Sequence, residues 1–570
     1  MRLNTIYCIV IGTLLAEIAF AQAPVVFFTD LTSGPNTGGQ NNNGTILTVY
    51  GKNFGATQGS STVTVGGGTV AAYLVWGGHN KAVTTLAQLE TISVAIGSSA
   101  ATGTVVVTTP QGASTCANTL ENCQFTVRSG NIYNVATTGS NGASGAWTTP
   151  WQTIPYAAHT AGAGSIVYVQ NGVNASSVDN YNAAVNVQVT GTSTNPIAFV
   201  VYPGATATIG TSSTSRGVYI GYSGGSYTTW KGFTVVASEE GYEHLGTTYT
   251  RIVDNDVSCP NGNGQDACNH AESAATYVFY YGNYLHDTGT ACSTDCKEYH
   301  DVYMSTNTQH VWIGWNEIAP QPAQTTPATL NGGCRAVQFY STGGVDQGDL
   351  HVHDNWIHDS VCDAINFSTV NTDTAGGVEA YNNVIWHVGT GPTPTTSDSN
   401  YTAMNTGWIA SHTNPVLFYN NSIYDAGSRL LLGANGDSGA FSCNTPCQLK
   451  NNIIQLVSGE QYRTNTMISC CASDLSGSNN VWYGASSTPT QTTGNITTNP
   501  LYSSTSSPFD LRLQSTSPAI NAGVTISGLI YDITGLTRPQ GSSYDIGAYE
   551  FFNSGGSLLF NSLFSNSVVR

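Results

Sequence analysis

The motif His353-Asp-Asn-Trp-Ile decides the fold of this chain, because versions of it recur from residue 251 to residue 484. Other copies read Tyr381-Asn-Asn-Val-Ile and Tyr419-Asn-Asn-Ser-Ile. The asparagines that anchor the copies are Asn255, Asn283, Asn316, Asn355, Asn383, Asn421, Asn452 and Asn480. Subtracting successive numbers gives spacings of 28, 33, 39, 28, 38, 31 and 28. A recurring minimum with longer copies indicates one structural unit that is repeated, with loops inserted in some of the repeats.

Each repeat carries short runs of alternating apolar and polar residues, which are typical of strands. Only 8% of the residues are charged and 63 are glycine, so helix is not favoured. We therefore predict an all-β fold built as a β-solenoid. The anchoring asparagines are expected to be structural, because Asn tolerates left-handed backbone at turns and its amide can bond from one coil to the next.

The charge of the chain limits its partners. The formal net charge of −18 over 570 residues argues against nucleic acid and against an anionic membrane surface. It is also unfavourable for a polyanionic substrate, unless a bound cation or a local basic patch intervenes.

Residues 1–21 have the pattern of a secretory signal peptide. Arg2 is followed by an apolar stretch, and Ala19-Phe-Ala forms a cleavage site that ends at Ala21. No later run is long enough to span a bilayer, so we expect a secreted protein without stable membrane insertion. Of the 13 cysteines, Cys8 leaves with the signal, and an even number remains, as is typical of disulfides. Local pairs are expected for Cys116 with Cys123, Cys259 with Cys268, Cys292 with Cys296, and Cys443 with Cys447.

Two stretches resemble known families. Residues 24–128 read as short strands of a small β-sandwich, and Val49-Tyr-Gly-Lys-Asn-Phe-Gly resembles an IPT/TIG immunoglobulin-like domain, which implies an accessory module. Residues 130–552 resemble the right-handed parallel β-helix, or pectin-lyase-like, superfamily of exported bacterial proteins. The segment Asp545-Ile-Gly-Ala-Tyr-Glu-Phe is similar to the closing segment of such proteins. A short helix near Ile154–Thr160 would cap the first coil, and residues 553–570 form a tail.

One strand of the repeat can be aligned across coils without gaps. It reads Arg216-Gly-Val-Tyr-Ile, His300-Asp-Val-Tyr-Met, Arg335-Ala-Val-Gln-Phe and Asp363-Ala-Ile-Asn-Phe. Strand alternation buries the third and fifth residues and turns the fourth outward. The outward residues are our candidates for substrate binding: Tyr219, Tyr303, Gln338 and Asn366. Cys334 and Cys362 precede two of these strands one coil apart, within disulfide reach at the spacing of stacked strands.

The first residues of these strands place His300, Arg335 and Asp363 in one column, beside a dense ionisable segment. The candidate catalytic residues are His300, Asp301, Arg335, Asp363, Lys297 and Glu298. In a lyase, His300 or Lys297 would be the base and Arg335 would neutralise a uronate carboxylate. In a glycoside hydrolase, the carboxylates would act as a pair. A purely structural ion pair between Arg335 and Asp363 is the competing interpretation.

Other ionisable groups have simpler interpretations. An acidic patch that includes Glu239, Glu240 and Glu243, with His244, could bind calcium, although a solvated loop is an alternative. His351, His353 and Asp354 belong to a third patch. His286-Asp and His358-Asp follow their anchoring asparagines at the same offset, which favours a role in the turn.

These observations predict a secreted β-helix protein that binds and cleaves an extracellular polysaccharide, by a lyase or a glycoside hydrolase mechanism. The alternative is a non-catalytic glycan-binding or surface and matrix protein. The chain does not contain the complete set of Asn-Thr-Asp, Asp-Asp and Gly-His-Gly motifs of polygalacturonases, and it has no clear calcium-and-lysine pattern of a pectate lyase. The β-helix fold does not itself choose between these functions.

Overall fold

The computed structural model describes residues 22–262, 266–290, 299–321, 334–341, 347–389, 401–406, 413–426, 438–443, 446–457, 475–484 and 488–552. The expected signal peptide, the tail, Lys297, Glu298, Cys292 and Cys296 lie outside these ranges.

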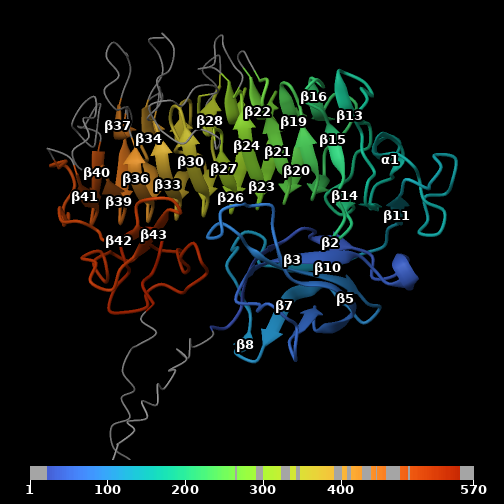
Figure 1. The fold of residues 1–570 in the computed structure, drawn as a ribbon, viewed down its shortest axis with the longest axis horizontal. Coiled ribbons are helices and arrows are strands. Elements are labelled where there is room, and N and C mark those ends of the chain that lie inside the picture. Colours follow the sequence, from blue (N-terminus) through green and yellow to red (C-terminus); the bar gives the residue numbers. More distant parts are fainter. Residues whose placement is uncertain are drawn as a thin grey trace, which may run out of the picture.

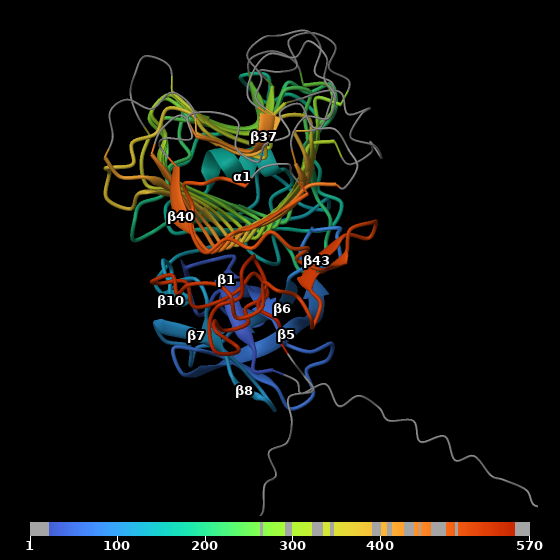
Figure 2. The same cartoon turned by 90° about the vertical axis from the view of Figure 1, so that its left-hand side faces the viewer.

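Three parallel sheets run side by side along the molecule and form the walls of a solenoid (Figures 1 and 2). Within the described residues they contain twelve, nine and ten strands. From β14 to β37, each coil contributes one strand to each of the three sheets, and neighbouring coils pair these strands in parallel. The chain is therefore a parallel β-helix.

The twelve-stranded sheet consists of β11 (Ile132–Val135), β12 (Ile166–Val169), β14 (Ile197–Val201), β17 (Thr228–Lys231), β20 (Thr248–Val253), β23 (Thr276–Tyr281), β26 (Gln309–Gly314), β29 (Leu350–His353), β32 (Val378–Tyr381), β35 (Val416–Tyr419), β38 (Cys447–Lys450) and β40 (Leu475–Ser478). The nine-stranded sheet consists of β13 (Ala183–Val187), β16 (Arg216–Ile220), β19 (Glu240–Leu245), β22 (Ala267–Glu272), β25 (His300–Ser305), β28 (Val337–Tyr340), β31 (Ile365–Phe367), β34 (Tyr401–Thr406) and β37 (Ser438–Cys443). The ten-stranded parallel sheet consists of β15 (Thr208–Gly210), β18 (Thr234–Val236), β21 (Asp256–Cys259), β24 (Tyr284–Thr288), β27 (Glu317–Ala319), β30 (Trp356–Ser360), β33 (Val384–Val388), β36 (Ser422–Ala426), β39 (Ile453–Gln455) and β41 (Val481–Tyr483).

The solenoid is filled by the inward side chains that strand alternation predicts. Val302, Met304, Val337 and Phe339 are fully buried in one continuous apolar core. Helix α1 (Ile154–Thr160) packs against β13 at the first coil, where Thr153 accepts a hydrogen bond from the backbone N–H of Tyr156. The helix thus covers the open end of the core (Figure 2), which confirms the predicted cap and its bounds.

The anchoring asparagines form a buried ladder between the twelve-stranded and ten-stranded sheets. Asn255 donates from its backbone N–H and from Nδ2 to Oδ1 of Asn283, at 2.9 and 3.2 Å. The same pair of bonds recurs at each step to Asn480. The ladder confirms the predicted bonding from coil to coil.

The left-handed residue of this turn is not the ladder asparagine, as we expected, but the residue before it. Positive φ angles occur at Asp254, Gly282, Trp315, Asp354, Asn382, Asn420, Asn451 and Asn479. The ladder asparagine is instead held by two neighbouring coils, because its amide needs a fixed orientation to bond in both directions. The preceding residue makes the corner.

The N-terminal strands form a separate, largely antiparallel sheet. Its members are β1 (Val25–Thr29), β2 (Ser33–Gly34), β3 (Ile46–Lys52), β4 (Thr62–Val65), β5 (Gly68–His79), β6 (Glu90–Ile96), β7 (Gly103–Thr109), β8 (Gly112–Ala113), β9 (Thr115–Cys116) and β10 (Gln124–Val127), with a 3-10 turn at Gln40–Asn42. The longest of these strands is β5, with 12 residues. It pairs with both β4 and β6 and thereby joins the two parts of the sheet.

This N-terminal unit is seated on the twelve-stranded sheet (Figures 1 and 2). The Tyr50 hydroxyl donates to Asp254 at 2.7 Å, and the buried Arg251 guanidinium lies 3.1 Å from Glu121. Aromatic rings of Phe28 and Trp315 also pack across the junction. The unit therefore covers part of one face of the solenoid through specific buried contacts.

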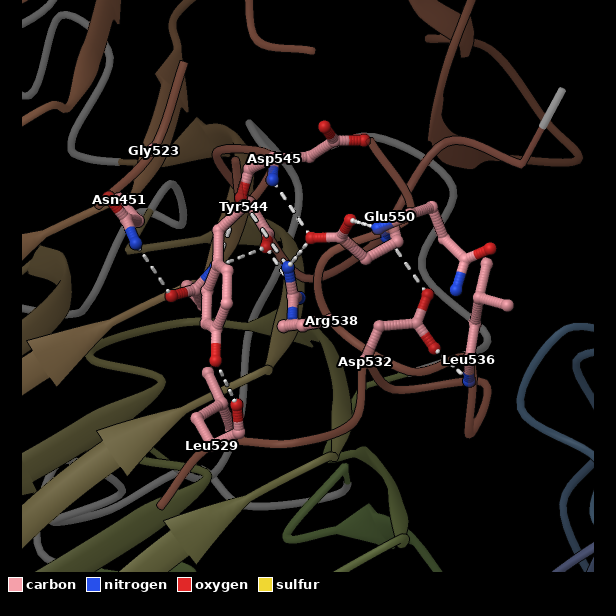
Figure 3. Close-up of polar contacts among 12 residues, drawn as sticks. Asn451, Gly523, Leu529, Asp532, Leu536, Arg538, Tyr544, Asp545 and Glu550 are labelled. Atoms are coloured by element: carbon pink, nitrogen blue, oxygen red, sulfur yellow. Dashed lines mark hydrogen bonds and ion pairs between the residues drawn. The ribbon is translucent and has the colours of Figure 1, made fainter. Parts of the chain in front are cut away.

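The last named strands of the coils are β40 and β41, and parallel bridges from Ser478 to Thr493 and from Val481 to Ile496 extend the stack. Beyond it, β42 (Tyr502–Ser504) and β43 (Asp510–Leu513) form a hairpin, and the following chain packs on the outside of the coils. Figure 3 shows the buried centre of this segment, where Arg538 Nη1 lies 2.8 Å from Glu550 Oε1. Arg538 also donates to Asn382, a corner residue of the solenoid, at 3.2 Å.

Three of the predicted cysteine pairs form disulfides: Cys116–Cys123, Cys259–Cys268 and Cys334–Cys362. Cys447 is also disulfide-bonded, but the side chain of Cys443 lies outside the described part, so their pairing stays a prediction. Among the described residues, no helix is long and apolar enough to cross a membrane.

Candidate functional site

The outer face of the nine-stranded sheet carries one continuous column of polar and aromatic side chains. The strand register places Tyr219 beside Glu243, followed by His270, Tyr303, Gln338, Asn366 and Asn405 on successive coils. The four residues proposed for substrate binding therefore do lie in one outward column. Tyr219, Gln338 and Asn366 are nevertheless almost completely covered.

The predicted catalytic column exists, but its members are engaged with each other or buried. Arg335 Nε lies 3.1 Å from Asp363, which is fully buried and also accepts from the backbone and hydroxyl of Thr402. His300 is buried, and burial, followed by the charge of Arg335, lowers its pKa well below the usual value. The competing interpretation of Arg335–Asp363 as an ion pair between coils agrees with this geometry.

Asp301, the second residue of β25, is also fully buried. Burial raises its pKa to about 7, although hydrogen bonds with Thr288 and Asn269 oppose the shift. Asp301 and Asp363, two of the three carboxyl groups proposed for a hydrolase, are thus both fully buried, and the third, Glu298, lies outside the described residues.

A second ionic group lies nearer the N-terminal end of the same face, and we call it the Arg216 cluster. It consists of Arg216, Glu240, Glu243, Asp266 and His270. Arg216 Nε contacts both glutamates, at 2.6 Å for Glu240. His270 Nδ1 lies 3.3 Å from Glu240 and 3.2 Å from Asp266. The result is a row of alternating acidic and basic side chains that ends in Asp266 on one side and Glu243 on the other.

The two glutamates of the Arg216 cluster differ in protonation. Burial and the neighbouring Glu240 charge raise the pKa of Glu243 to about 9. Burial opposes ionisation of Glu240 as well, but hydrogen bonds with His270 and Glu243 and nearby positive charges lower its pKa to about 2. At neutral pH, Glu243 is therefore a carboxylic acid that shares its proton with an ionised neighbour. A pair of carboxyl groups with separated pKa values is a recurring feature of acid–base sites.

His270 carries a positive charge in this arrangement. Burial works against protonation, but hydrogen bonds with Asp266 and Glu240 raise the pKa of His270 to about 10. Its other ring nitrogen lies 3.1 Å from the Ser305 hydroxyl. An imidazolium between two carboxylates explains the short distances without any further ligand.

A cation could also be held at this point, since ligand atoms of Glu240, Asp266 and His270 lie within 4.8 Å of one another. Calcium prefers a shell of six to eight oxygen ligands, whereas this group includes an imidazole nitrogen, and Arg216 already neutralises Glu240. The donor set does not fit the calcium ion that the acidic patch suggested.

Exposed tyrosines lie directly beside the Arg216 cluster. The rings of Tyr181 and Tyr219 stack with centroids 5.0 Å apart, and Tyr222 lies 6.3 Å from Tyr219. Tyr222 is 80% exposed and Tyr181 45% exposed. Arg216 in turn lies over the Tyr219 ring at 5.8 Å. Aromatic faces next to polar groups can stack on the C–H face of a sugar ring while its hydroxyls bond to the rim.

The sequence contained a signal for this cluster that the strand alignment left unused. Glu240-Gly-Tyr-Glu-His matches Arg216-Gly-Val-Tyr-Ile position by position, and β16 indeed pairs with β19 in that register. The coil between them is only 24 residues long, shorter than the recurring minimum of 28. Asp266 belongs to no repeated motif, so the alignment could not predict that it lies beside His270.

The two His-Asp pairs behave as turn residues, as their fixed offsets predicted. His286 bonds to Asp287 at 2.8 Å and to Asp256 at 2.9 Å. His358 bonds to Asp359 at 2.8 Å and to Glu317 at 3.2 Å. In each pair the aspartate has a positive φ angle.

No protein-family model matches the chain, and no curated protein matches it significantly. Among solved structures, the chain is similar to pectate lyase Pel9A, with 13% identity over 74% of this chain and 97% of the other, and a TM-score of 0.46. XylC in complex with xylose matches with 11% identity, covering 73% and 98% of the two chains, at a TM-score of 0.38. The family 28 exopolygalacturonase of Yersinia enterocolitica matches with 10% identity, covering 72% and 85%, at a TM-score of 0.30.

Proposed function

We propose that this protein is an exported enzyme that hydrolyses a neutral polysaccharide on the outer face of the nine-stranded sheet. The observation that carries the proposal is the contact of Arg216 with both Glu240 and Glu243, together with that of His270 with Glu240 and Asp266, on one outer face. Glu243, protonated at neutral pH, serves as the general acid for the leaving oxygen. Asp266, with a side chain 43% exposed, serves as the carboxylate that activates water or attacks the sugar.

The charge of the Arg216 cluster favours hydrolysis over elimination. With Glu243 protonated, the two negative charges of Glu240 and Asp266 balance the two positive charges of Arg216 and His270 within the Arg216 cluster, and the adjacent Glu239 makes the wider group net negative. A net negative site stabilises the positively charged, oxocarbenium-like transition state of glycoside hydrolysis. Elimination from a uronate would bring another carboxylate into this site and build negative charge upon it. The lyase mechanism expected from His300 and Arg335 has less support, since Arg335 is held by Asp363.

Substrate would lie along the column, with a sugar ring stacked on Tyr222 and Tyr181. Tyr303 and the more covered Gln338 continue the same face toward the next coils. We further propose that residues 1–21 direct export and that the N-terminal unit is an IPT/TIG-like accessory module. Disulfides such as Cys334–Cys362 fit an oxidising compartment.

The test is an assay of neutral and uronate-containing polysaccharides for new reducing ends and for unsaturated products. Glu243→Gln should lower kcat at least 100-fold, as expected for the loss of a general acid, and Asp266→Asn should do the same. Asp510→Asn, in an exposed ion pair with Arg512 on β43, is the matched control and should leave the rate unchanged. Unsaturated products, or full activity in Glu243→Gln, would refute the mechanism.

A non-catalytic glycan-binding protein is the second candidate. It is favoured by the internal pairing of Arg216, which contacts both Glu240 and Glu243. Retention of a neutral polysaccharide without any new reducing ends would select this function. If Tyr222→Ala no longer retained the polysaccharide, the binding site would include the exposed tyrosines beside the Arg216 cluster.

A further inference from the structure

A second candidate site lies on another face of the solenoid, where the N-terminal unit leaves part of the twelve-stranded sheet open. A cleft of about 570 Å³ is bounded there by the sheet, by residues 117–120 of the N-terminal unit and by residues 528–532 of the C-terminal segment. This volume falls within the range of about 300–1,000 Å³ that is typical of small-ligand sites. Three separate parts of the chain thus enclose one space.

The floor of the cleft is a column of flat rings on neighbouring strands. Trp312 on β26 stacks on Phe279 at 5.1 Å and on His351 at 5.2 Å, with interplanar angles of 12° and 8°. Next to it, Tyr277 stacks on His310 at 4.5 Å. Tyr277 is 42% exposed, so its ring is open to a ligand.

A polar network closes one end of this floor. His351 bonds through one ring nitrogen to Asp349 and through the other to Glu379, both at 2.8 Å. Asp349 is also 2.7 Å from His310, and Glu379 accepts from the Tyr419 hydroxyl at 2.8 Å. Because both nitrogens of His351 face carboxylates, the ring is an imidazolium. The carboxylates keep lone pairs that can accept from hydroxyl groups.

The backbone under these side chains is held in an unfavourable conformation. Tyr277, His310 and Asp349 have φ angles of 56°, 57° and 59°, and they occupy equivalent positions on successive coils. The next coil has Gly377 at this position, with φ of 72°. A bulky residue in this region costs of the order of 1–2 kcal/mol relative to glycine. Aromatic and ionisable side chains are therefore present here although glycine would be the less strained residue.

We infer that this cleft binds a neutral saccharide, with a sugar ring stacked on Tyr277 and Trp312 and its hydroxyls bonded to Asp349 and Glu379. Those two carboxylates and Asp354 outnumber the His351 cation, so the cleft disfavours uronates. The site is distinct from the Arg216 cluster, which lies on the nine-stranded sheet. The cleft would keep the enzyme bound to its polysaccharide or recognise the end of a polysaccharide chain. It would not take part in bond cleavage.

Binding is best measured by calorimetry with neutral oligosaccharides in a Glu243→Gln, Tyr222→Ala background, which suppresses hydrolysis and weakens the tyrosine platform. Adding Tyr277→Gly should weaken binding at least 10-fold while the midpoint of thermal unfolding stays the same or rises, because glycine relieves the left-handed backbone. Trp312→Ala should weaken binding as well. Phe552→Ala, which removes another exposed aromatic residue, is the control and should change nothing.

Three outcomes would overturn the inference: no binding in the background variant, equal binding of galacturonate oligomers, or unchanged affinity in Tyr277→Gly. A lower thermal midpoint in Tyr277→Gly with unchanged affinity would assign the ring to packing alone. None of these results depends on hydrolysis. Failure of the proposed enzymatic activity can therefore be told apart from failure of this site.

Discussion

Cys334 and Cys362 lie one above the other on successive coils, with their Cα atoms 4.9 Å apart and their sulfurs bonded. The bond closes a loop of 28 residues, which corresponds to roughly 3–4 kcal/mol in the loop-entropy model. The double variant Cys334→Ala, Cys362→Ala should therefore lower the thermal midpoint of the oxidised protein. Removing Cys259–Cys268, which spans only 9 residues, should lower it less. Equal effects would show that chain entropy does not govern the stabilisation.

Asn355→Ala should destabilise the β-helix by about 2–4 kcal/mol. Asn355 donates to the Ile313 carbonyl at 2.8 Å and accepts from the backbone and amide of Asn316. Its loss leaves buried donors and an acceptor without partners, each costing about 1–3 kcal/mol before relaxation. Denaturant titration followed by circular dichroism would measure the change. The exposed Asn174, which accepts a single backbone N–H from Thr208, is the control, and its alanine variant should lose less than about 1 kcal/mol.

Arg538→Met should destabilise the C-terminal segment by about 3–5 kcal/mol, because it leaves Glu550 buried without its partner. Limited proteolysis should then cut within residues 528–552, and cleft binding should weaken because residues 528–532 form one of its walls. Arg512→Ala removes an exposed ion pair with Asp510 and should cost less than about 1 kcal/mol. Similar sensitivity of both variants would contradict the structural role of Arg538.

The stability of the protein should fall in alkaline solution. Burial opposes protonation of His286 and His358, but hydrogen bonds with their carboxylates raise each pKa to about 9. A histidine whose pKa is higher when folded contributes its full stabilisation below about pH 6.5 and loses it as pH rises through about 9. Thermal midpoints measured between pH 7 and 10 should decrease. The double variant His286→Asn, His358→Asn should show a flatter decline.

The hydrolytic rate should have an alkaline limb set by Glu243. A general acid must be protonated, so kcat should fall as pH rises through about 9. Elimination with Glu243 as the base would give the opposite slope. Initial rates between pH 6 and 10, corrected for the fraction of folded enzyme, would distinguish the two.

The architecture could be predicted because one position in each coil, that of the ladder asparagine, does not accept another residue type. The ladder asparagine must donate and accept at the same time, so Asn255 and its equivalents remain visible through insertions that change the coil length. The alignment of Val302 with Val337, and of Cys334 with Cys362, followed from that register. The corner residue was assigned wrongly, since Trp315 and Asp354 share no side-chain chemistry that marks a left-handed backbone.

The candidate sites were harder to predict because they combine residues from unlike coils. Arg335 and Asp363 were found correctly as neighbours, but the sequence does not reveal that Thr402 completes the bonding of Asp363. The cleft depends on Gly528–Asp532 and on loop 117–120, which are hundreds of residues from Trp312 in the chain. Docking of distant segments leaves no periodic pattern in the sequence.

The asparagine ladder has one more property, which concerns its direction. Each ladder amide from Asn255 to Asn452 donates to the next ladder asparagine toward the C-terminus, and each from Asn283 to Asn480 accepts from the one before it. The side-chain dipoles therefore point the same way along the solenoid axis, and each bond polarises the next. The ladder resembles the aligned peptide dipoles of an α-helix, built entirely from side chains, with its positive end toward Asn480.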